Sequence, residues 1–434
     1  MIPHTRGRAA LGLLFLTVLV AFPAVSAAQD GFYVKDNDTV VFYGDSITEQ
    51  RLYSTFVETF IVTRYPRMPV RFVHSGWGGD RVTGGGGGVI DERLRRDVIA
   101  YQPTVMTIML GMNDGSYKAF DDAIFERFRT GYEHILQVMK EAVPGLRITL
   151  LQPSPYDDVT QAPTFPGGYN AVLVRYAQYI RELAGRDQMA TADLNAPVVE
   201  ALKKANVLDP TGARAIIRDR IHPAAGGHLL MAASLLKAWG ATPLVTAVEI
   251  DAGSKQAGKT QNTTLTGLVV DKTVSWTQKD AALPMPVNMR APVLPPALRR
   301  AADTVDLALK SSDFMEALNQ QTLLVRGLPG AKYTLKINSA PAGSFSREEL
   351  EKGINLAALP TPMAAQAAAV HQLTMRRSDL HELRWRQVQM PYKDDKILRL
   401  PTVLDNLDAI DAELAARQRA AAQPAACYYE LVPE

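Results

Sequence analysis

Short apolar runs alternate with amphipathic stretches along the first half of the chain, from residue 39 to about residue 240. A short apolar run that ends in turn residues is typical of a strand buried on both faces, whereas apolar positions three and four residues apart indicate a helix. Alternation of the two predicts a parallel sheet covered by helices on both faces. The predicted strands are residues 39–43, 70–74, 104–110, 147–152 and 189–194, and the predicted helices are residues 52–65, 121–142, 169–184 and 224–239.

The pattern changes after residue 241. Residues 242–340 are rich in Thr, Val, Pro and Gly and contain strand-like runs, which predicts a small β-rich region. The predicted strands of this region are residues 244–250, 265–270, 322–325 and 333–337.

Signals for helix starts dominate the last part of the chain, residues 341–434. Ser346 and Glu349 have the spacing of a capping box, and Thr361 followed by Pro362 fits an N-cap and a first helical residue. These signals predict a helical C-terminal region. The expected long helices run from residue 362 toward residue 389 and over residues 402–418.

Residues 1–28 have the three-part pattern of a secretory signal peptide. A basic start, MIPHTRGR, precedes a short apolar run and the small residues of AVSAAQD. The run is too short for a comfortable membrane span, although an uncleaved anchor is the alternative. Cleavage after Ala27 or Ala28 would give a secreted or periplasmic protein that begins with an α/β domain over residues 29–241.

Composition narrows the classes of partner. Loss of the signal peptide removes Arg6 and Arg8 and lowers the formal charge from +2 to 0. A neutral surface gives no electrostatic reason to expect nucleic acid or an anionic membrane as a partner. Cys427 is the single cysteine of the sequence, which excludes an intrachain disulfide and a metal site built from cysteines. The oligomeric state cannot be predicted from these features.

A serine follows the first predicted strand, at the edge where open α/β sheets bind ligands. In TVVFYGDSITEQ the strand ends at Gly44, and Ser46 would be exposed just beyond it. A helix N-cap is the alternative role for such a serine. A serine nucleophile needs a base, a carboxylate that orients the base, and donors that stabilise an oxyanion.

The segment DRIHP, residues 219–223, contains candidates for the base and the carboxylate. His222 precedes the last predicted helix of the α/β region, in a loop at the same edge of the sheet, and Asp219 lies three residues earlier. A turn can bring the carboxylate to the Nδ1–H of His222 and leave Nε2 toward Ser46. That arrangement fixes the tautomer of the base and stabilises its protonated form.

Two loops are candidates for oxyanion donors. GWGGD, residues 76–80, follows the second strand, and its glycines allow a backbone N–H to approach a substrate closely. GMND, residues 111–114, follows the third strand and places the amide of Asn113 at the same edge. Ordinary turns are the alternative for each loop. Three successive strands that end in Ser, Gly and Asn nevertheless favour a hydrolase site.

These segments resemble, in the same order, four sequence blocks of the SGNH hydrolases, also called GDSL esterases and lipases. GDSIT matches the first block, with Ser46 as the nucleophile, and Asp219 and His222 match the DxxH of the last block. Gly79 and Asn113 match the donors of the second and third blocks, which with the N–H of Ser46 form the family's oxyanion hole.

The resemblance covers about 200 residues. It implies a flavodoxin-like three-layer α/β/α sandwich, with five parallel strands in the order 2-1-3-4-5, followed by a C-terminal mixed β and helical region. It also implies ester hydrolysis without a metal or other cofactor.

Three features near the second block need their own interpretation. His74 stands where the family often has Asn, and it is a candidate for substrate contact, although we favour a packing role. Trp77 would form either a stacking wall for a sugar ring or acyl group, or an apolar plug beneath the loop. The glycine run at residues 84–88 lacks the Gly-Lys-Ser/Thr of a phosphate loop and predicts a flexible backbone near the site.

The sequence thus predicts a secreted serine esterase that acts on small acyl esters, with O-acetyl groups on a polysaccharide expected from the habits of the family and from export. An O-acyltransferase that uses the same residues and a non-catalytic carbohydrate-binding protein are the alternatives. We also hypothesise that the segment after residue 240 packs near the carboxyl edge of the sheet and shapes the approach of a large substrate. A structural buttress is the alternative role for that segment.

Overall fold

The computed structural model describes residues 31–287 and 304–434. The predicted signal peptide lies outside these residues. Among the described residues, no helix is both long enough and apolar enough to cross a bilayer.

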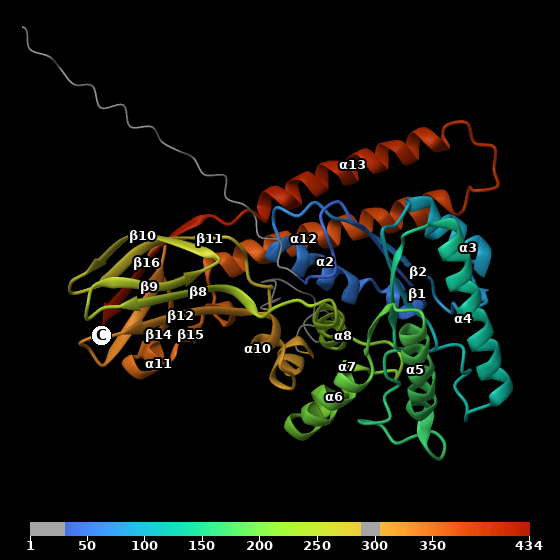
Figure 1. The fold of residues 1–434 in the computed structure, drawn as a ribbon, viewed down its shortest axis with the longest axis horizontal. Helices are drawn as coiled ribbons and strands as arrows, with labels where there is room; N and C mark the ends of the chain where they lie inside the picture. Colours follow the sequence, from blue (N-terminus) through green and yellow to red (C-terminus); the bar gives the residue numbers. More distant parts are fainter. Residues whose placement is uncertain (1–30, 288–303) are drawn as a thin grey trace, which may run out of the picture.

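A sheet of five parallel strands forms the centre of the N-terminal half (Figure 1). The chain order of its strands is 2-1-3-4-5, so the predicted topology is confirmed. The side chains of the first strand are almost completely buried, as expected for a strand covered on both faces. In spatial order the strands are β2 (Arg71–Gly76), β1 (Thr39–Gly44), β5 (Val105–Met109), β6 (Arg147–Leu151) and β7 (Ala190–Ala192).

Helices cover both faces of this sheet (Figure 1). On one face α2 (Leu52–Arg64) packs against α8 (Ala225–Ala238). On the other face α4 (Asp122–Ala142) lies beside α5 (Gly168–Arg186), where the rings of Phe128 and Tyr176 are 4.4 Å apart. The remaining longer helices of this half are α3 (Ile90–Asp97), α6 (Ala196–Leu208) and α7 (Pro210–Ile216). The three-layer α/β/α architecture is therefore confirmed.

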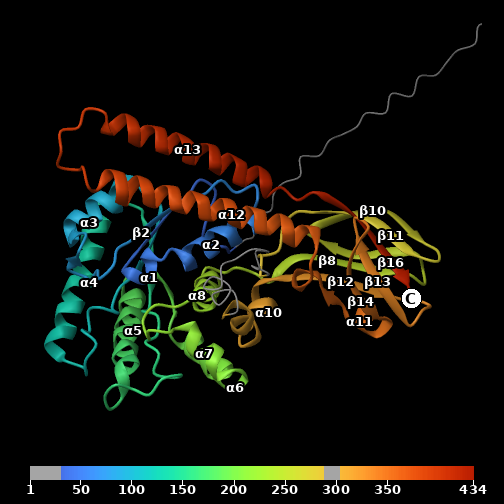
Figure 2. The same cartoon turned by 180° about the vertical axis from the view of Figure 1, so that it is seen from behind.

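Two further sheets form the other end of the molecule (Figures 1 and 2). The first contains, in spatial order, β10 (Thr263–Val270), β11 (Val274–Asp280), β16 (Ala426–Pro433), β13 (Lys332–Ile337) and β14 (Ala340–Ser346). The second contains β15 (Ile354–Asn355), β12 (Gln320–Arg326), β8 (Leu244–Asp251) and β9 (Gln256–Gln261).

The C-terminal region, residues 341–434, contains strands as well as the predicted helices. The C-terminal strand β16 lies between β11 and β13, so the last residues of the chain complete a sheet that residues 263–346 begin. Cys427, Tyr429 and Leu431 point into the core at every second position. The end of the chain is therefore an integral strand, and the other limits of the predicted regions stay a prediction.

A helical hairpin connects the β sheets back to the α/β half. Its first helix, α12 (Pro362–Glu382), begins at the predicted N-cap Thr361 and packs along α2. It continues as a π-helix, η3 (Leu383–Gln389), and α13 (Leu400–Ala421) then returns alongside α12. Both views show the hairpin lying over the α/β half and reaching toward its far side (Figures 1 and 2). The predicted capping box is also present, at the start of α11 (Arg347–Lys352).

Candidate active site

The carboxyl ends of three neighbouring strands bring the predicted site segments together. Gly44, the last residue of β1, pairs with Gly76 of β2 and with Met109 of β5. The loops that follow these strands therefore start side by side. They carry Ser46, the segment after Gly76, and Asn113.

Ser46 is the first residue of the short helix α1 (Ser46–Glu49). The preceding residue, Asp45, has extended backbone angles, and its Oδ1 accepts the N–H of Ile47 at 3.0 Å. This N-cap ends β1 and turns the chain sharply, so that Ser46 stands at the sheet edge. The alternative role, in which Ser46 itself caps the helix, is not the one that the structure shows.

Ser46, His222 and Asp219 form one hydrogen-bonded relay. The Nε2 of His222 lies 2.8 Å from the Oγ of Ser46, and its Nδ1 lies 2.7 Å from the Oδ2 of Asp219. The other carboxylate oxygen of Asp219 accepts the backbone N–H groups of Ile221 and His222, at 3.0 and 2.8 Å. The predicted turn thus exists, with Arg220 in the left-handed region at φ 73°.

The carboxylate of Asp219 is held in its charged form. Partial burial works to raise the pKa of Asp219, but hydrogen bonds from the backbone and ring of His222 and from the backbone of Ile221 outweigh it and lower that pKa. An ionised carboxylate on Nδ1–H stabilises the imidazolium that forms when Nε2 takes a proton.

Asn113 joins the second and third loops. Its Nδ2 donates to the carbonyl oxygen of Asp80 at 3.0 Å, and its Oδ1 accepts the hydroxyl of Tyr117 at 2.7 Å. An amide nitrogen carries two N–H donors, and the bond to Asp80 uses one of them. Gly79, the residue before Asp80, has φ +77°, a left-handed conformation that favours glycine.

The family of this domain follows from a comparison with known families. Residues 42–230, which include all five predicted catalytic and oxyanion residues, match the model of the GDSL-like lipase/acylhydrolase family. The chain carries a GDSL-like hydrolase domain. The family is one of lipases and acylhydrolases, so this domain is a carboxylic ester hydrolase.

Two known proteins are similar to this chain over different extents. The solved structure of a gut microbial diltiazem-metabolizing enzyme is 27% identical with a TM-score of 0.80, over 93% of this chain and 100% of that chain. An acetylxylan esterase of Geobacillus stearothermophilus is 25% identical over 227 residues, which are 48% of this chain and 96% of that esterase. The similarity to the diltiazem-metabolizing enzyme therefore includes the C-terminal half of this chain. The similarity to the acetylxylan esterase covers only about half of this chain.

Three acids, Asp45, Asp80 and Asp114, are buried in or next to the loops that follow β1, β2 and β5. Burial raises the pKa of Asp45 to about 7, and the nearby carboxylates of Asp114 and Asp80 add to this effect. Burial likewise raises the pKa of Asp114 to about 6, although its Oδ1 accepts the backbone N–H of Val82 at 3.0 Å. Asp80 is paired with the buried guanidinium of Arg93 at 2.8 Å. Among the described residues, no group of His, Cys, Asp and Glu side chains is arranged to hold a metal ion.

The structure places His74 in the packing role that we favoured over substrate contact. Its side chain is only 3% exposed, and its Nδ1 and Nε2 lie 2.7 Å from Ser54 and 3.3 Å from Glu58. The ring also stacks on Phe42. His74 is therefore part of the packing between β2 and α2, because its strand position points it into that layer.

The partly exposed ring of Trp77 packs against side chains of the C-terminal hairpin. The guanidinium of Arg386 lies 3.5 Å from the centre of its ring, and Trp385 meets the ring edge-on at 5.5 Å. Part of the glycine run packs against the same ring, since a Cβ on Gly87 would come within 2.6 Å of it. The run forms the small hairpin of β3 (Gly84–Gly85) and β4 (Gly88–Val89), and its expected flexibility stays a prediction.

Three residues at the site were not predicted from the sequence. Tyr117 lies only four residues after Asn113, and this short spacing is a local signal that the two side chains can meet. Glu49 ends α1, and its carboxylate binds Arg386 from the C-terminal hairpin at 2.7 Å. No local pattern connects Arg386 with a site so far away in the sequence.

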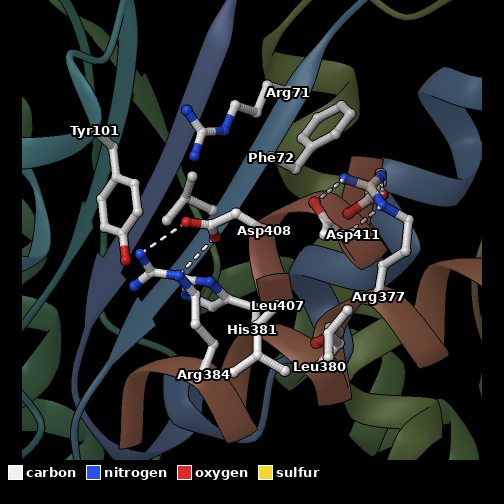
Figure 3. Close-up of a pocket in the computed structure, with 13 residues that line it drawn as sticks. Arg71, Phe72, Tyr101, Arg377, Leu380, His381, Arg384, Leu407, Asp408 and Asp411 are labelled. Carbon is white, nitrogen blue, oxygen red and sulfur yellow. Dashed lines mark hydrogen bonds and ion pairs between the residues drawn. The ribbon is translucent and has the colours of Figure 1, made fainter. Parts of the chain in front are cut away.

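A small cavity lies beneath the hairpin, and none of the predicted catalytic residues lines it. Figure 3 shows it between the hairpin helices and β2, with ion pairs of Arg377 to Asp411 and of Arg384 to Asp408. Its volume of about 30 Å³ has room for no more than a water molecule or two, so it is no substrate site. The ion pair of Arg377 joins α12 to α13, and that of Arg384 joins η3 to α13.

Proposed function

We propose that this protein is an exported serine esterase that hydrolyses small acyl esters, in the first place O-acetyl esters of carbohydrates. The observation that carries the proposal is the relay from Ser46 through His222 to Asp219, with donor–acceptor distances of 2.8 and 2.7 Å. Distances of this size are those of a nucleophile and a base in hydrogen-bond contact.

The proposed reaction begins with proton transfer from Ser46 to His222. The Oγ of Ser46 attacks the ester carbonyl carbon while Nε2 takes the proton and Asp219 stabilises the resulting imidazolium. When the tetrahedral intermediate collapses, His222 returns the proton to the leaving alcohol oxygen. Water then attacks the acyl-serine with His222 as the base again, which releases the acid and restores Ser46.

The negative charge of the tetrahedral intermediate needs donors that are in place beforehand. We assign this role to the backbone N–H groups of Ser46 and Gly79 and to the second N–H of the Asn113 amide. The bonds of Asn113 to Asp80 and Tyr117 hold the amide in one orientation, which favours such a role. The proposed mechanism uses no metal and no other cofactor.

Two considerations support a carbohydrate that carries a small acyl group as the substrate. The similar esterase of Geobacillus stearothermophilus acts on acetylxylan by its name, and 96% of its length aligns with 48% of this chain. The expected signal peptide would place this chain outside the cytoplasm, where polysaccharides are available as substrates. An O-acyltransferase with the same residues stays the alternative, since only the acceptor of the acyl group differs.

A second candidate substrate class is a small drug-like ester. The similarity to the diltiazem-metabolizing enzyme extends over 93% of this chain, which includes the C-terminal half that the acetylxylan esterase does not match. Diltiazem therefore belongs in the same test as the carbohydrate esters.

The test is a substrate panel for the purified protein without residues 1–28. Nitrophenyl esters of two, four and eight carbons, acetylated xylan and diltiazem would be incubated with it, and acid release and product masses measured. The proposal expects the two-carbon ester and acetylated xylan to be hydrolysed fastest. Transfer of the acetyl group to an added sugar in preference to water would indicate the acyltransferase. No release above the enzyme-free rate from any ester would contradict the proposal.

A further inference from the structure

Arg386 of the C-terminal hairpin contacts two segments of the active site. Its Nη1 binds the Oε1 of Glu49 at 2.7 Å, and its guanidinium carbon lies 3.5 Å from the centre of the Trp77 ring. Its side chain is 20% exposed, so Arg386 sits at the rim of the domain rather than in its core. Its two partners belong to the two segments that carry the nucleophile and the proposed oxyanion donor.

Glu49 connects the nucleophile helix with the oxyanion loop. It is the last residue of α1 and lies three residues after Ser46. A Cβ on Gly78 would come within 2.8 Å of its Oε2, so one carboxylate oxygen lies directly against the loop backbone while the other binds Arg386. This contact limits how closely α1 and the loop can approach each other, and Arg386, which binds both Glu49 and Trp77, limits how far they can move apart.

Trp77 is the second point at which the hairpin holds the loop. It opens the segment that leads to Gly79, and its backbone N–H donates to the carbonyl of Gly44 at 3.0 Å. Trp385 meets its ring edge-on and is itself fixed, because it is buried and its Nε1 donates to Asp97 at 2.8 Å. A cation over an indole face is a favourable contact, so Arg386 and Trp385 together restrain the indole.

The backbone of the hairpin is unusual at this place. Trp385 and Arg386 lie in η3, a π-helix that continues α12. Such helices are rare and occur frequently at functional sites. Because a π-helix has more residues in each turn than an α-helix, consecutive side chains diverge less, and both residues can face Trp77.

We propose that Arg386 is a positioning residue of the esterase site, which holds the oxyanion loop at a fixed distance from Ser46 through Glu49 and Trp77. This inference rests on the proposed function. It assigns to the hairpin a role in the chemical step, beyond that of covering apolar surface. Arg386 acts through the residues it binds and need not touch the substrate.

The test is the kinetics of Arg386→Ala on a two-carbon nitrophenyl ester. A small displacement of the donors should lower kcat by roughly ten- to a hundredfold, with KM within about twofold of wild type. Arg386→Lys keeps the charge next to Glu49 and should recover part of the lost kcat. Combining Arg386→Ala with Glu49→Gln should cost less than the product of the two single losses, because both changes remove one interaction.

Two control variants separate positioning from general support by the hairpin. Arg384→Ala removes another arginine of η3, whose partner at 2.5 Å is Asp408 of α13 (Figure 3). Lys393→Ala removes another ion pair between the hairpin and the α/β half, to Glu92 at 2.6 Å. Neither residue contacts Glu49 or Trp77 in the structure, so kcat should stay within about twofold in both variants. Melting temperatures of all variants should differ little, since partly exposed ion pairs add little to stability.

Three results would overturn the inference. They are an unchanged kcat in Arg386→Ala, a change confined to KM, and equal losses of kcat in Arg386→Ala and either control. The change in KM alone would mean that Arg386 binds substrate. Absence of ester hydrolysis by the wild-type protein is a different failure, because it would refute the proposed function before any variant is made.

Discussion

At the scale of single residues, the relay was predictable because its members are close in sequence or mark the end of a strand. Asp219 and His222 lie within one turn, and Ser46 follows the last residue of β1. Tyr117 and Arg386 were not predicted, since most tyrosines in loops and most arginines in helices have no part in an active site. Their contacts to Asn113 and Glu49 exist only in the folded chain.

The bond from Tyr117 to Asn113 leads to a prediction about graded losses. Asn113→Ala should lower kcat by roughly a hundred- to a thousandfold, as the loss of an oxyanion donor does. Tyr117→Phe removes only the hydroxyl that orients the amide. Partial burial raises the pKa of Tyr117 to about 12, so this hydroxyl is protonated in the wild type and can donate to Asn113. Loss of this hydroxyl should lower kcat by up to about tenfold, which corresponds to the free energy of one hydrogen bond.

Steady-state kinetics on a small acetate ester measures both effects. The expected changes lie in kcat, because an oxyanion donor acts mainly in the transition state. An equal loss in the two variants, or an effect on KM alone, would mean that Asn113 is not the donor proposed.

At the scale of elements, regular patterns were predicted well and short or irregular ones were not. The strands of the parallel sheet and the start of α12 at Thr361 match the structure closely because their apolar runs and caps are unambiguous. β16 was missed because its alternation of buried and exposed positions follows an Ala-rich stretch that hides it. The π-helix η3 could not be predicted, since seven residues are too few to separate its periodicity from that of an α-helix.

The N-cap of α1 gives a prediction about stability and pH. The pKa of Asp45 is about 7 in the folded protein against an ordinary value of 3.8, so the folded protein binds this proton more tightly than the unfolded chain does. The free energy of unfolding should therefore fall as pH rises from about 4 to 7. Asp45→Asn keeps an oxygen that can accept the N–H of Ile47 but has no proton to lose.

The measurement is urea unfolding of both proteins across this range of pH. The stability of Asp45→Asn relative to wild type should grow between pH 4 and 7, by on the order of 4 kcal/mol in total, and then level off. A difference that stays constant with pH would show that Asp45 does not titrate as described.

At the scale of the whole molecule, the hairpin is coupled to the core of the α/β half by buried charges. Arg377 of α12 donates to the carboxylate of Glu58 in α2 at 2.9 Å, and Gln418 of α13 donates to the same oxygen at 3.0 Å. Burial works to raise the pKa of Glu58, but Arg377 and His74 outweigh it and lower that pKa. Deleting everything after residue 242 would leave Glu58 without Arg377, so the role of the hairpin is better tested by single substitutions.

Breaking this buried pair should be costly. Arg377→Ala leaves the buried carboxylate of Glu58 without its guanidinium partner and should lower the free energy of unfolding by about 3–5 kcal/mol. Adding Glu58→Gln to Arg377→Ala should restore part of the loss, because the buried charge is then gone. Equilibrium unfolding near pH 7, well above the ordinary pKa of a glutamate, measures both. A loss below about 1 kcal/mol would show that the hairpin is not anchored through Glu58.

The central claim is that Ser46 is the nucleophile of an esterase. The measurement that tests it most directly compares wild type and Ser46→Ala on a two-carbon nitrophenyl ester, with folding checked by circular dichroism. The account predicts that the variant folds like wild type and loses activity on the order of a millionfold, by analogy with another serine hydrolase. Turnover by folded Ser46→Ala at a rate near that of wild type would contradict it.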